Sequence, residues 1–400
     1  MTPTTQDTDF IRGQLPSGWT ETTLGEATKI MSGSTPSTKN GSYRDGNIVR
    51  ITPKDLSSHN SVYITKGERN ITKEGLVNSS AQLLPKNAIL FSSRAPIGYV
   101  AIAGTELTTN QGFKNVVCDE RESHFKFFYY LLKNKAEYIE KMSSGSTFSE
   151  ASATVMRSVT ISLPPLPEQQ AIAAVLSSFD DKIELLREEN KTLEATAQGI
   201  FKEWFGKYKV DDELPKGWRV GKLGEEFDIL MGQSPAGESY NENKEGMVFF
   251  QGRTDFTERF PTTRLHTTEP KRIANKFDVL VSVRAPVGDI NIATETCCIG
   301  RGLAAVKSDN KSYCLYKIKS LKECFDAFET EGTVFGSINK DSFKNIEVII
   351  PSGDFTKKFE SIAHPMDLKI FNNYQQVQSL SKTRDELLPK LMSGEVRVKF

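Results

Sequence analysis

The sequence predicts an α+β protein in which two copies of one mixed α/β globular domain are joined by two long helices. We expect the helices to pair as an antiparallel coiled coil and to relate the copies by a pseudo-two-fold axis. Three observations predict this architecture: an internal repeat, a helical stripe of apolar residues that ends each copy, and short strand-like segments inside each copy. A chain of 400 residues is long enough for roughly two to four domains.

The internal repeat begins with a Leu-Pro-x-Gly-Trp motif and continues in the same order through both copies. Three matched pairs of segments are residues 15–19 and 214–218 (LPSGW and LPKGW), residues 92–98 and 282–288 (SSRAPIG and SVRAPVG), and residues 145–148 and 332–335 (GSTF and GTVF). The separation between matched segments shrinks along the chain, because small deletions are tolerated in surface loops. The chain is therefore a duplicated unit and not an array of short repeats.

The segments between the helices carry short runs of β-branched and aromatic residues bounded by Gly, Pro, Asn or Asp, which is typical of strands. The expected strands include residues 48–51, 88–91 and 116–118 in the first copy and residues 247–250, 279–282 and 346–350 in the second. Residues 125–142 and 313–328 have the pattern of one helix in each copy. Each copy is therefore expected to be a mixed α/β domain.

Each copy ends in a segment with the periodicity of a long amphipathic helix. Apolar residues recur at steps of three or four over residues 172–204 and again over residues 359–391, which places them on one helix face. With Glu and Lys between them, these stripes are typical of a coiled-coil seam. The expected seam residues are Ile172, Phe179, Ile183, Leu186, Leu193 and Trp204 in the first helix and Phe359, Met366, Ile370, Val377, Leu380 and Leu387 in the second.

A helix over residues 167–206 would be about 60 Å long, so the alternative, a core helix of one large domain, is less favoured. Asn190 and Asn373 interrupt the two stripes at different levels of the repeat. We therefore expect each asparagine to face an apolar residue of the other helix. A polar residue in a seam commonly fixes the register at some cost in stability.

These patterns set the expected domain boundaries. The first nine residues are polar and contain acidic residues, which argues against a secretory signal and favours a disordered tail. In chain order we expect a disordered tail over residues 1–14, a first globular domain over residues 15–163, a first spacer helix over residues 164–210, a second globular domain over residues 211–352 and a second spacer helix over residues 353–400.

The composition excludes some classes of protein. The 51 basic and 51 acidic residues give a net charge of zero, which argues against a simple cationic nucleic-acid binder. No apolar run is long enough to span a bilayer. The five cysteines have no metal-site spacing, and we expect free thiols in a reducing cytoplasm.

Motifs for catalysis are missing from the sequence. There is no Walker A motif, no complete dinucleotide-binding fingerprint and no nucleophile elbow. The four histidines are scattered without zinc-ligand spacing, and no Asn-Pro-Pro-aromatic or Asp-Pro-Pro-aromatic tetrapeptide is present. The acidic residues 211–213 have the pattern of a solvated linker. We therefore expect no catalytic residue, no metal site and no cofactor bound by this chain.

The ordered motifs resemble those of the specificity subunits of type I restriction-modification systems. The resemblance rests on the repeated Leu-Pro-x-Gly-Trp and Arg-Ala-Pro-x-Gly segments, and on residues 163–169 (LPPLPEQ), 200–205 (IFKEWF) and 387–396 (LLPKLMSGEV). It covers essentially residues 15–400. One departure is visible, because the second helix entrance, residues 351–355 (PSGDF), lacks the Pro-x-x-Glu-Gln pattern of the first.

The resemblance implies a non-catalytic, DNA-binding subunit in the cytoplasm. Each globular domain would be a target-recognition domain that reads one half of a bipartite target in double-stranded DNA, and the spacer helices would set the gap between the halves. Two methyltransferase subunits would dock against the helices, and two restriction (translocase-nuclease) subunits would join them. S-adenosylmethionine, ATP and Mg would be bound by these partners. The alternative, suggested by the zero net charge, is an adaptor that binds proteins through two domains on a coiled-coil strut.

Candidates for DNA contact are basic and amide side chains of the two globular domains. Arg94 and Arg284 are equivalent in the two copies and could contact phosphate or guanine, or alternatively brace the turn before proline. Because both copies share this arginine, phosphate contact suits it better than base contact. Residues that differ between copies, such as Gln111 against Arg301 or Lys54 against Thr254, are better candidates for reading bases, because different half-sites need different readers. The candidates are Lys39, Arg44, Arg50, Lys54, Arg94, Gln111, Arg253, Arg284 and Arg301.

Overall fold

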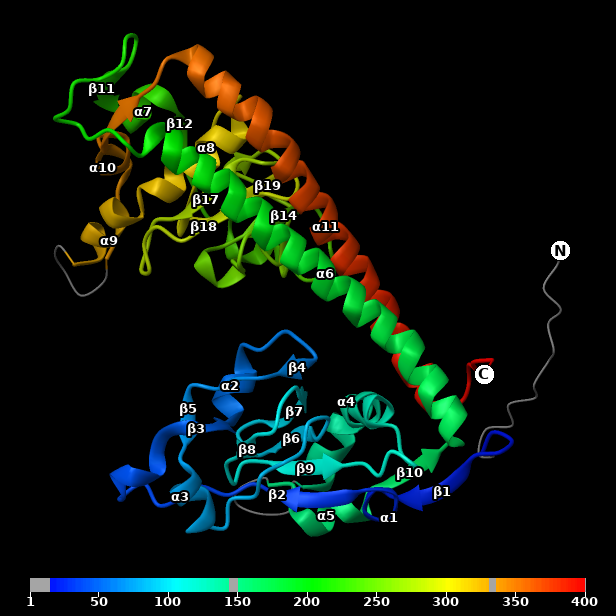
Figure 1. The fold of residues 1–400 in the computed structure, drawn as a ribbon. Helices are drawn as coiled ribbons and strands as arrows, with labels where there is room; N and C mark the ends of the chain where they lie inside the picture. Colours follow the sequence, from blue (N-terminus) through cyan, green and yellow to red (C-terminus); the bar gives the residue numbers. More distant parts are fainter. Residues whose placement is uncertain (1–14, 144–149, 331–335, 400) are drawn as a thin grey trace. The chain divides into compact units, whose positions relative to one another are not determined.

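The structure is a computed structural model of the chain that describes residues 15–143, 150–330 and 336–399. It divides into two compact units: unit 1 comprises Met1–Arg187 and Gln375–Phe400, and unit 2 comprises Glu188–Tyr374. The division runs through both long helices, so each unit holds a globular part and a portion of each helix (Figure 1). The expected tail over residues 1–14 and the repeated motif at 145–148 and 332–335 lie outside the described residues.

Unit 1 contains a five-stranded sheet, a three-stranded sheet and a strand pair. The first has the order β2 (Lys29–Ser32), β9 (Lys114–Val117), β6 (Ile89–Ser93), β7 (Ile97–Ala103), β4 (Tyr63–Ile64), and the second has the order β5 (Arg69–Ile71), β3 (Arg44–Ile51), β8 (Thr108–Thr109). The pair is β1 (Thr20–Thr23) with β10 (Thr160–Leu163), and the short helices are α1 (Leu24–Ala27), α2 (Pro53–Ser57), α3 (Lys73–Val77), α5 (Ala153–Ser158) and the 3-10 turn η1 (Gly41–Tyr43). Helix α4 (Phe125–Met142) packs on β6 and β7.

Unit 2 repeats much of this topology. Its four-stranded sheet has the order β12 (Asp228–Met231), β20 (Leu303–Lys307), β17 (Val279–Ser282), β18 (Ile290–Ile292), which matches β2-β9-β6-β7. A second sheet has the order β13 (Tyr240–Asn241), β15 (Leu265–Thr267), β14 (Met247–Phe250), β19 (Cys297–Ile299), β16 (Ile273–Ala274), and β11 (Arg219–Lys222) pairs with β21 (Glu347–Ile350). The helices are α7 (Leu223–Glu226), α8 (Lys311–Ser320), α9 (Lys322–Thr330) and α10 (Lys340–Lys344), with 3-10 turns η2 (Gly237–Ser239) and η3 (Arg253–Asp255). The predicted duplication of an α+β domain is confirmed.

The single helix predicted over residues 313–328 is two helices in the structure, and that prediction is wrong in this respect. Helix α8 ends before Leu321, and α9 begins after it. Leu321 is only 8% exposed and belongs to the core of unit 2. The break therefore lets both short helices bury an apolar face against the same core.

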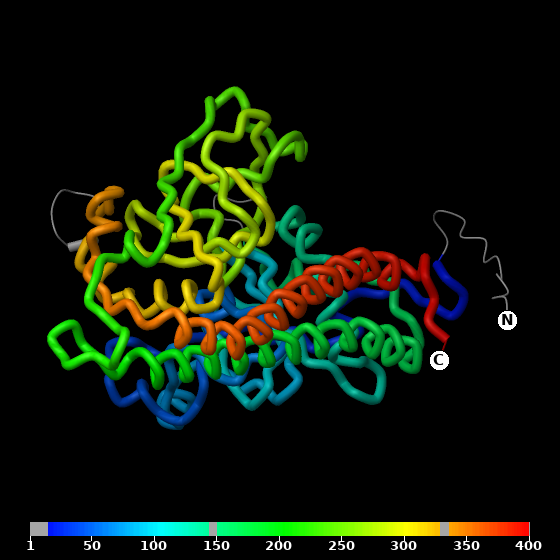
Figure 2. Tube along the Cα trace, turned by 90° about the horizontal axis from the view of Figure 1, so that it is seen from above, coloured from blue at the N-terminus to red at the C-terminus, as the bar shows by residue number. Residues whose placement is uncertain are grey.

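The two long helices, α6 (Leu166–Phe205) and α11 (Gly353–Ser393), run antiparallel inside each unit (Figures 1 and 2). In unit 1, Ile183 and Leu186 cluster with Val377 and Leu380. In unit 2, the ring centroids of Trp204 and Phe359 are 6.2 Å apart. Residues later in α6 thus contact residues earlier in α11, which is the predicted antiparallel pairing.

The expected seam residues are buried to different degrees. Buried members are Ile172, Ile183, Leu186, Phe359, Ile370 and Val377. Partly buried members are Phe179, Leu193, Trp204, Met366, Leu380 and Leu387. Several of them join the cores of the globular parts, because Ile172 packs in the core of unit 1 and Ile370 in that of unit 2. Each helix portion therefore packs both on its partner helix and on a globular part.

The two asparagines of the seam face each other, so the prediction that each faces an apolar residue is wrong. Asn373 is fully buried and donates from Nδ2 to Oδ1 of Asn190 at 2.9 Å and to Oε2 of Glu189 at 2.8 Å. In an antiparallel pair, the position opposite a residue is counted back from the other end of the partner helix. Comparing equivalent positions of the two copies therefore gives the wrong neighbour. The Asn373 amide nitrogen is thus bonded to both neighbours, whereas its buried Oδ1 has no hydrogen-bond partner among the described residues.

The described residues hold no helix long and apolar enough to cross a membrane. Within the same ranges, no group of three or more His, Cys, Asp and Glu side chains is placed to hold a metal ion. All five cysteines are free thiols, as predicted, and three of them are buried in unit 2.

Candidate nucleic-acid interface

Four loops of unit 1 meet at one edge of its globular part. We call this edge loop rim 1 and define it as residues 33–37, 52–55, 93–99 and 109–112. Backbone hydrogen bonds join the loops, from Ser34 N to Thr109 O at 2.9 Å, from Asn110 N to Ile51 O at 3.1 Å and from Ser93 N to Gly112 O at 2.7 Å. The rim therefore has a fixed backbone frame, although its segments are far apart in the sequence.

Unit 2 has the same frame, which we call loop rim 2 and define as residues 232–236, 252–255, 283–289 and 299–302. Its joining bonds run from Gly232 N to Leu303 O at 2.9 Å, from Gly300 N to Phe250 O at 2.8 Å and from Val283 N to Gly302 O at 2.9 Å. Loops on a rigid β scaffold are the usual carriers of binding residues. The two rims thus present different side chains on a common backbone.

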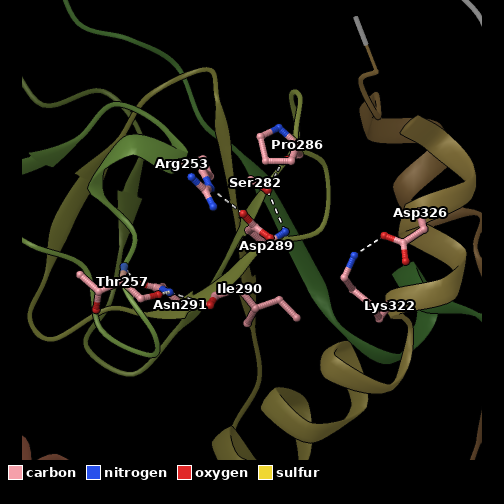
Figure 3. Close-up of polar contacts among 9 residues, drawn as sticks. All are labelled: Arg253, Thr257, Ser282, Pro286, Asp289, Ile290, Asn291, Lys322 and Asp326. Carbon is pink, nitrogen blue, oxygen red and sulfur yellow. Dashed lines mark hydrogen bonds and ion pairs between the residues drawn. The ribbon is translucent and has the colours of Figure 1, made fainter. Parts of the chain in front are cut away.

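The repeated Arg-Ala-Pro-x-Gly motif forms one hairpin tip in each rim. In rim 1, the buried Ser92 Oγ donates to Pro96 O at 2.8 Å and accepts from Tyr99 N at 2.8 Å. In rim 2, Ser282 Oγ donates to Pro286 O at 2.7 Å and accepts from Asp289 N at 2.9 Å (Figure 3).

The glycine of the motif has a positive φ in both units, +102° at Gly98 and +86° at Gly288, a conformation that residues with a Cβ rarely adopt. The motif therefore fixes a turn with Arg94 or Arg284 at its tip.

An aspartate anchors the second loop of each rim. Asp55 Oδ2 accepts from Thr52 N at 2.7 Å, and the buried Asp255 Oδ2 accepts from Gln251 N at 2.9 Å. Asp255 also pairs with Arg264 at 2.6 Å. Asp55 therefore fixes the loop that carries Lys54 through its backbone bond. Asp255 fixes the loop that carries Arg253 through its backbone bond and its ion pair with Arg264.

Rim 1 carries three of the candidate DNA contacts, Lys54, Arg94 and Gln111. Gln111 is exposed, and its Oε1 accepts from Thr35 Oγ1 at 2.7 Å. Arg94 lies 3.8 Å from Glu150, which also binds the buried Lys114 at 3.1 Å. The Arg94 side chain is still 41% exposed, so it remains accessible at the tip of the hairpin.

Lys54 and the basic candidates outside rim 1 have mixed surroundings. Lys54 is 77% exposed and pairs with Glu68 at 3.0 Å. Lys39 and Arg44 are exposed, and Arg44 begins β3, at the opposite end of that strand from rim 1. Of the four basic candidates between residues 39 and 54, only Lys54 therefore belongs to rim 1.

Arg50 is only 8% exposed, a burial that the sequence did not indicate. It lies directly opposite Arg69 in the pairing of β3 with β5. Burial, followed by the neighbouring Arg69 guanidinium, lowers the pKa of Arg50. Arg50 is therefore much less accessible than the exposed Lys39 and Arg44.

Rim 2 brings together all three candidates of unit 2. Arg253, Arg284 and Arg301 are exposed and lie on three different loops of this rim. Arg253 Nε donates to Asp289 Oδ2 at 2.6 Å (Figure 3). Sequence reasoning missed Asp289, which directly follows the repeated motif; its difference from Tyr99 in the first copy was the available signal.

Comparison with known proteins identifies the family. A sequence profile described as the type I restriction modification DNA specificity domain matches residues 16–195 and 215–370. The chain belongs to this family. The two matched regions agree with the duplication, and the resemblance inferred from the motifs is confirmed.

Two relatives of this specificity-subunit family are similar over almost their whole length. The type I restriction enzyme MjaIX specificity subunit of Methanocaldococcus jannaschii is 35% identical, with 98% of this chain and 96% of the relative covered. A putative type I restriction enzyme MjaX specificity subunit of the same organism is 30% identical, with 97% and 96% covered. The crystal structure of a type I restriction-modification system S subunit from M. genitalium is 20% identical, covers 98% of this chain and 99% of its own, and has a TM-score of 0.60, which supports the fold.

A buried Tyr-Asp-Arg network ties each globular part of this specificity-domain protein to its helices. In unit 1, Tyr130 Oη donates to Asp180 Oδ2 at 2.6 Å, and Arg384 pairs with the other oxygen of Asp180. Burial and the Asp180 carboxylate raise the pKa of Tyr130 far above its usual value.

Unit 2 has a similar network with an arginine of different origin. Tyr316 Oη donates to Asp367 at 3.0 Å, and Arg259 of the globular part contacts Asp367 at 2.5 Å and Glu194 at 2.9 Å. Each rim is thus held on a scaffold fixed to its helix portion by hydrogen-bonded charges. These residues carried no recognisable motif, because the contacts join distant segments.

The two helix entrances differ in a way that accounts for the missing Pro-x-x-Glu-Gln pattern. In unit 1, the fully buried Glu168 accepts from Trp19 Nε1 at 3.0 Å and from Arg397 at 2.6 and 2.9 Å. In unit 2, Phe355 packs against Trp204 and Trp218 with ring centroids 5.2 and 5.4 Å apart. The buried hydrogen bonds and ion pair of Glu168 in unit 1 are therefore replaced by a cluster of aromatic rings in unit 2.

Proposed function

We propose that this protein is the DNA-reading subunit of a type I restriction-modification complex, with unit 1 reading one half of a bipartite target and unit 2 the other. The observation that carries this proposal is the pair of loop rims, which share a backbone frame but differ in side chains. Gln111 of rim 1 is matched by Arg301 in rim 2. Two different readers on one scaffold suit an asymmetric target, as two identical readers suit a palindrome.

The candidate contacts divide into two roles under this proposal. Arg94 and Arg284, which both rims share, are suited to phosphate, and Gln111, Arg253 and Arg301 are suited to base edges. Lys39, Arg44 and Lys54 are exposed and can add backbone contacts, whereas Arg50 is buried and supports β3. Domain boundaries at residues 163, 210 and 352 would separate the two target-recognition domains from the spacer helices.

Partners would supply what the chain lacks. As a specificity subunit, the chain is not catalytic; S-adenosylmethionine, ATP and Mg would be held by two methyltransferase and two restriction subunits in the cytoplasm. A net charge of zero fits this division, because methyltransferase subunits would provide much of the cationic contact with the DNA backbone. The helices would dock those subunits and set the unread gap.

Exchange of one globular domain tests the proposal. The chain is co-expressed with its methyltransferase subunit, and methylated adenines are mapped across the host genome. Replacing residues 15–163 with the matching domain of another family member is expected to change one half-site and leave the other as it was. If both methylated half-sites stay the same after the exchange, the proposal is contradicted.

An adaptor that binds only proteins would be revealed by a second measurement. In a mobility-shift assay of the assembled complex, affinity for target DNA should fall steeply as salt rises, because phosphate contacts release counterions. Absence of any DNA shift at low salt would favour the adaptor. Family membership argues against that outcome.

A further inference from the structure

We propose that Arg253 reads a guanine in the half-site of unit 2 and that Asp289 is the positioning residue that orients it. This inference rests on the proposed function and names one base contact within it. The two residues come from different loops of rim 2, because Arg253 begins η3 and Asp289 lies between β17 and β18. Figure 3 shows their side chains turned toward each other.

The ion pair leaves the two Nη nitrogens of Arg253 available for a base. The contact uses Nε of Arg253, at 2.6 Å from Asp289 Oδ2. No partner for the two Nη nitrogens is found among the described residues, and the Arg253 side chain is 56% exposed. A guanidinium held through Nε presents both Nη groups in one plane, which is the arrangement needed for O6 and N7 of guanine in the major groove.

Asp289 is itself held firmly. Its backbone N–H donates to the buried Ser282 Oγ at 2.9 Å, and its carbonyl oxygen accepts from Ser282 N at 2.9 Å. The carboxylate therefore projects from a turn with little freedom, and the ion pair reduces the number of rotamers open to Arg253. A pre-oriented fork loses less entropy when it binds.

The carboxylate argues for a base contact and against a phosphate contact. Asp289 cancels much of the net charge of Arg253 and is 34% exposed, so it would repel a nearby phosphate. Hydrogen-bond donation to a base edge depends on orientation more than on net charge. Arg253 is thus better suited to reading a base than to holding the DNA backbone.

Rim 1 lacks the pair, which would confine this contact to one half-site. Tyr99 stands at the position of Asp289, with its N–H on the equivalent serine. Asp55 and Asp255 are equivalent in the two loops, so Pro53, two residues before Asp55, is the counterpart of Arg253. The nearby cation, Lys54, pairs with Glu68 instead. The guanine should therefore belong only to the half-site that unit 2 reads.

The test is motif mapping with the complete methyltransferase complex. Arg253→Ala and Arg253→Lys are expected to reduce the preference for guanine at one position of one half-site by roughly 10- to 100-fold, since lysine cannot make the bidentate contact. Arg253→Gln should move that preference toward adenine. Asp289→Asn should relax the same position less strongly, which a purely structural role would not do.

Arg219→Ala is the matched control. Arg219 pairs with Glu225 at 2.6 Å and is 54% exposed, but it lies on β11, in a different sheet from those that form rim 2. Its removal should leave the motif unchanged. Assembly of every variant is checked by gel filtration, and Arg253→Gln stands in if Arg253→Ala does not assemble.

Three outcomes would overturn the inference. They are an unchanged motif in all Arg253 variants, a uniform loss of methylation at every target with no relaxed position, and a wild-type half-site for unit 2 that contains no guanine. Failure of the proposed function would look different, because the wild-type complex would then give no site-specific methylation at all.

Discussion

At the residue scale, Asp367 is the carboxylate on which the anchoring of the globular part of unit 2 depends. Its side chain is 13% exposed and contacts the buried Arg259 and the Tyr316 hydroxyl. We predict that Asp367→Asn lowers the free energy of unfolding by about 2–3 kcal/mol, because Arg259 keeps Glu194 but loses a charged partner. The shift of the urea midpoint, followed by circular dichroism, measures the effect.

Asp326→Asn is the control for that prediction. Asp326 pairs with Lys322 on the surface of unit 2 and is 51% exposed (Figure 3). Exposed pairs contribute about 0–1 kcal/mol, so its loss should hardly move the midpoint. Equal effects of the two substitutions would contradict an anchoring role for Asp367.

Single residues of the candidate interface were predictable where they belonged to the repeat. Comparison of the copies pointed to Arg94, Arg284 and Arg301, and all three lie on the rims. Arg50 was selected for its charge, but its burial depends on the pairing of β3 with β5, which no local pattern records. Asp289 was missed because a carboxylate is not an obvious DNA contact until its partner is seen.

At the element scale, the facing asparagines make the pairing of α6 with α11 in unit 2 testable. Asn373→Leu leaves Asn190 beside an apolar side chain, and we predict a loss of about 1–2 kcal/mol in the free energy of unfolding. The double variant Asn190→Leu with Asn373→Leu should recover that loss, because two leucines pack without unsatisfied amides. A double-mutant cycle by urea unfolding measures the coupling, and strictly additive losses would contradict the pairing.

The elements themselves were largely predictable. Residues at steps of three or four predicted both long helices, because a helix that buries one face must repeat its apolar residues with that period. The segment 125–142 coincides with α4, and 279–282 coincides with β17. The break at Leu321 and the partners of the asparagines were not predictable, since both depend on which surfaces meet in three dimensions.

At the scale of the whole molecule, the return of α11 antiparallel to α6 brings both ends of the chain into one unit. Unit 1 takes its core from the beginning of the sequence and from the last turns of α11, where Leu391 and Met392 are buried. Beyond α11, Arg397 donates a hydrogen bond to the buried Glu168. The sequence repeat indicated two similar bodies, but it could not indicate that the division passes through both helices. That arrangement makes each helix a shared part of both units.

The continuity of α6 and α11 across that division gives a prediction for the proposed gap. Inserting one heptad into each helix, beside Asn190 and beside Asn373, keeps the seam in phase and adds about 10 Å of helix. Because DNA rises about 3.4 Å per base pair, the unread gap in the methylated motif should lengthen by about three base pairs while both half-sites stay the same. Genome-wide mapping of methylated adenines measures both quantities.

An insertion in α6 alone is the control for the paired insertion. It shifts one seam against the other by a full heptad, so that Asn190 and Asn373 no longer meet, and assembly or methylation should be lost. An assembled double-insertion complex that methylates the original gap would show that the helices do not set the distance between half-sites. Changed half-sites with an unchanged gap would instead place the effect of the insertion in the globular parts.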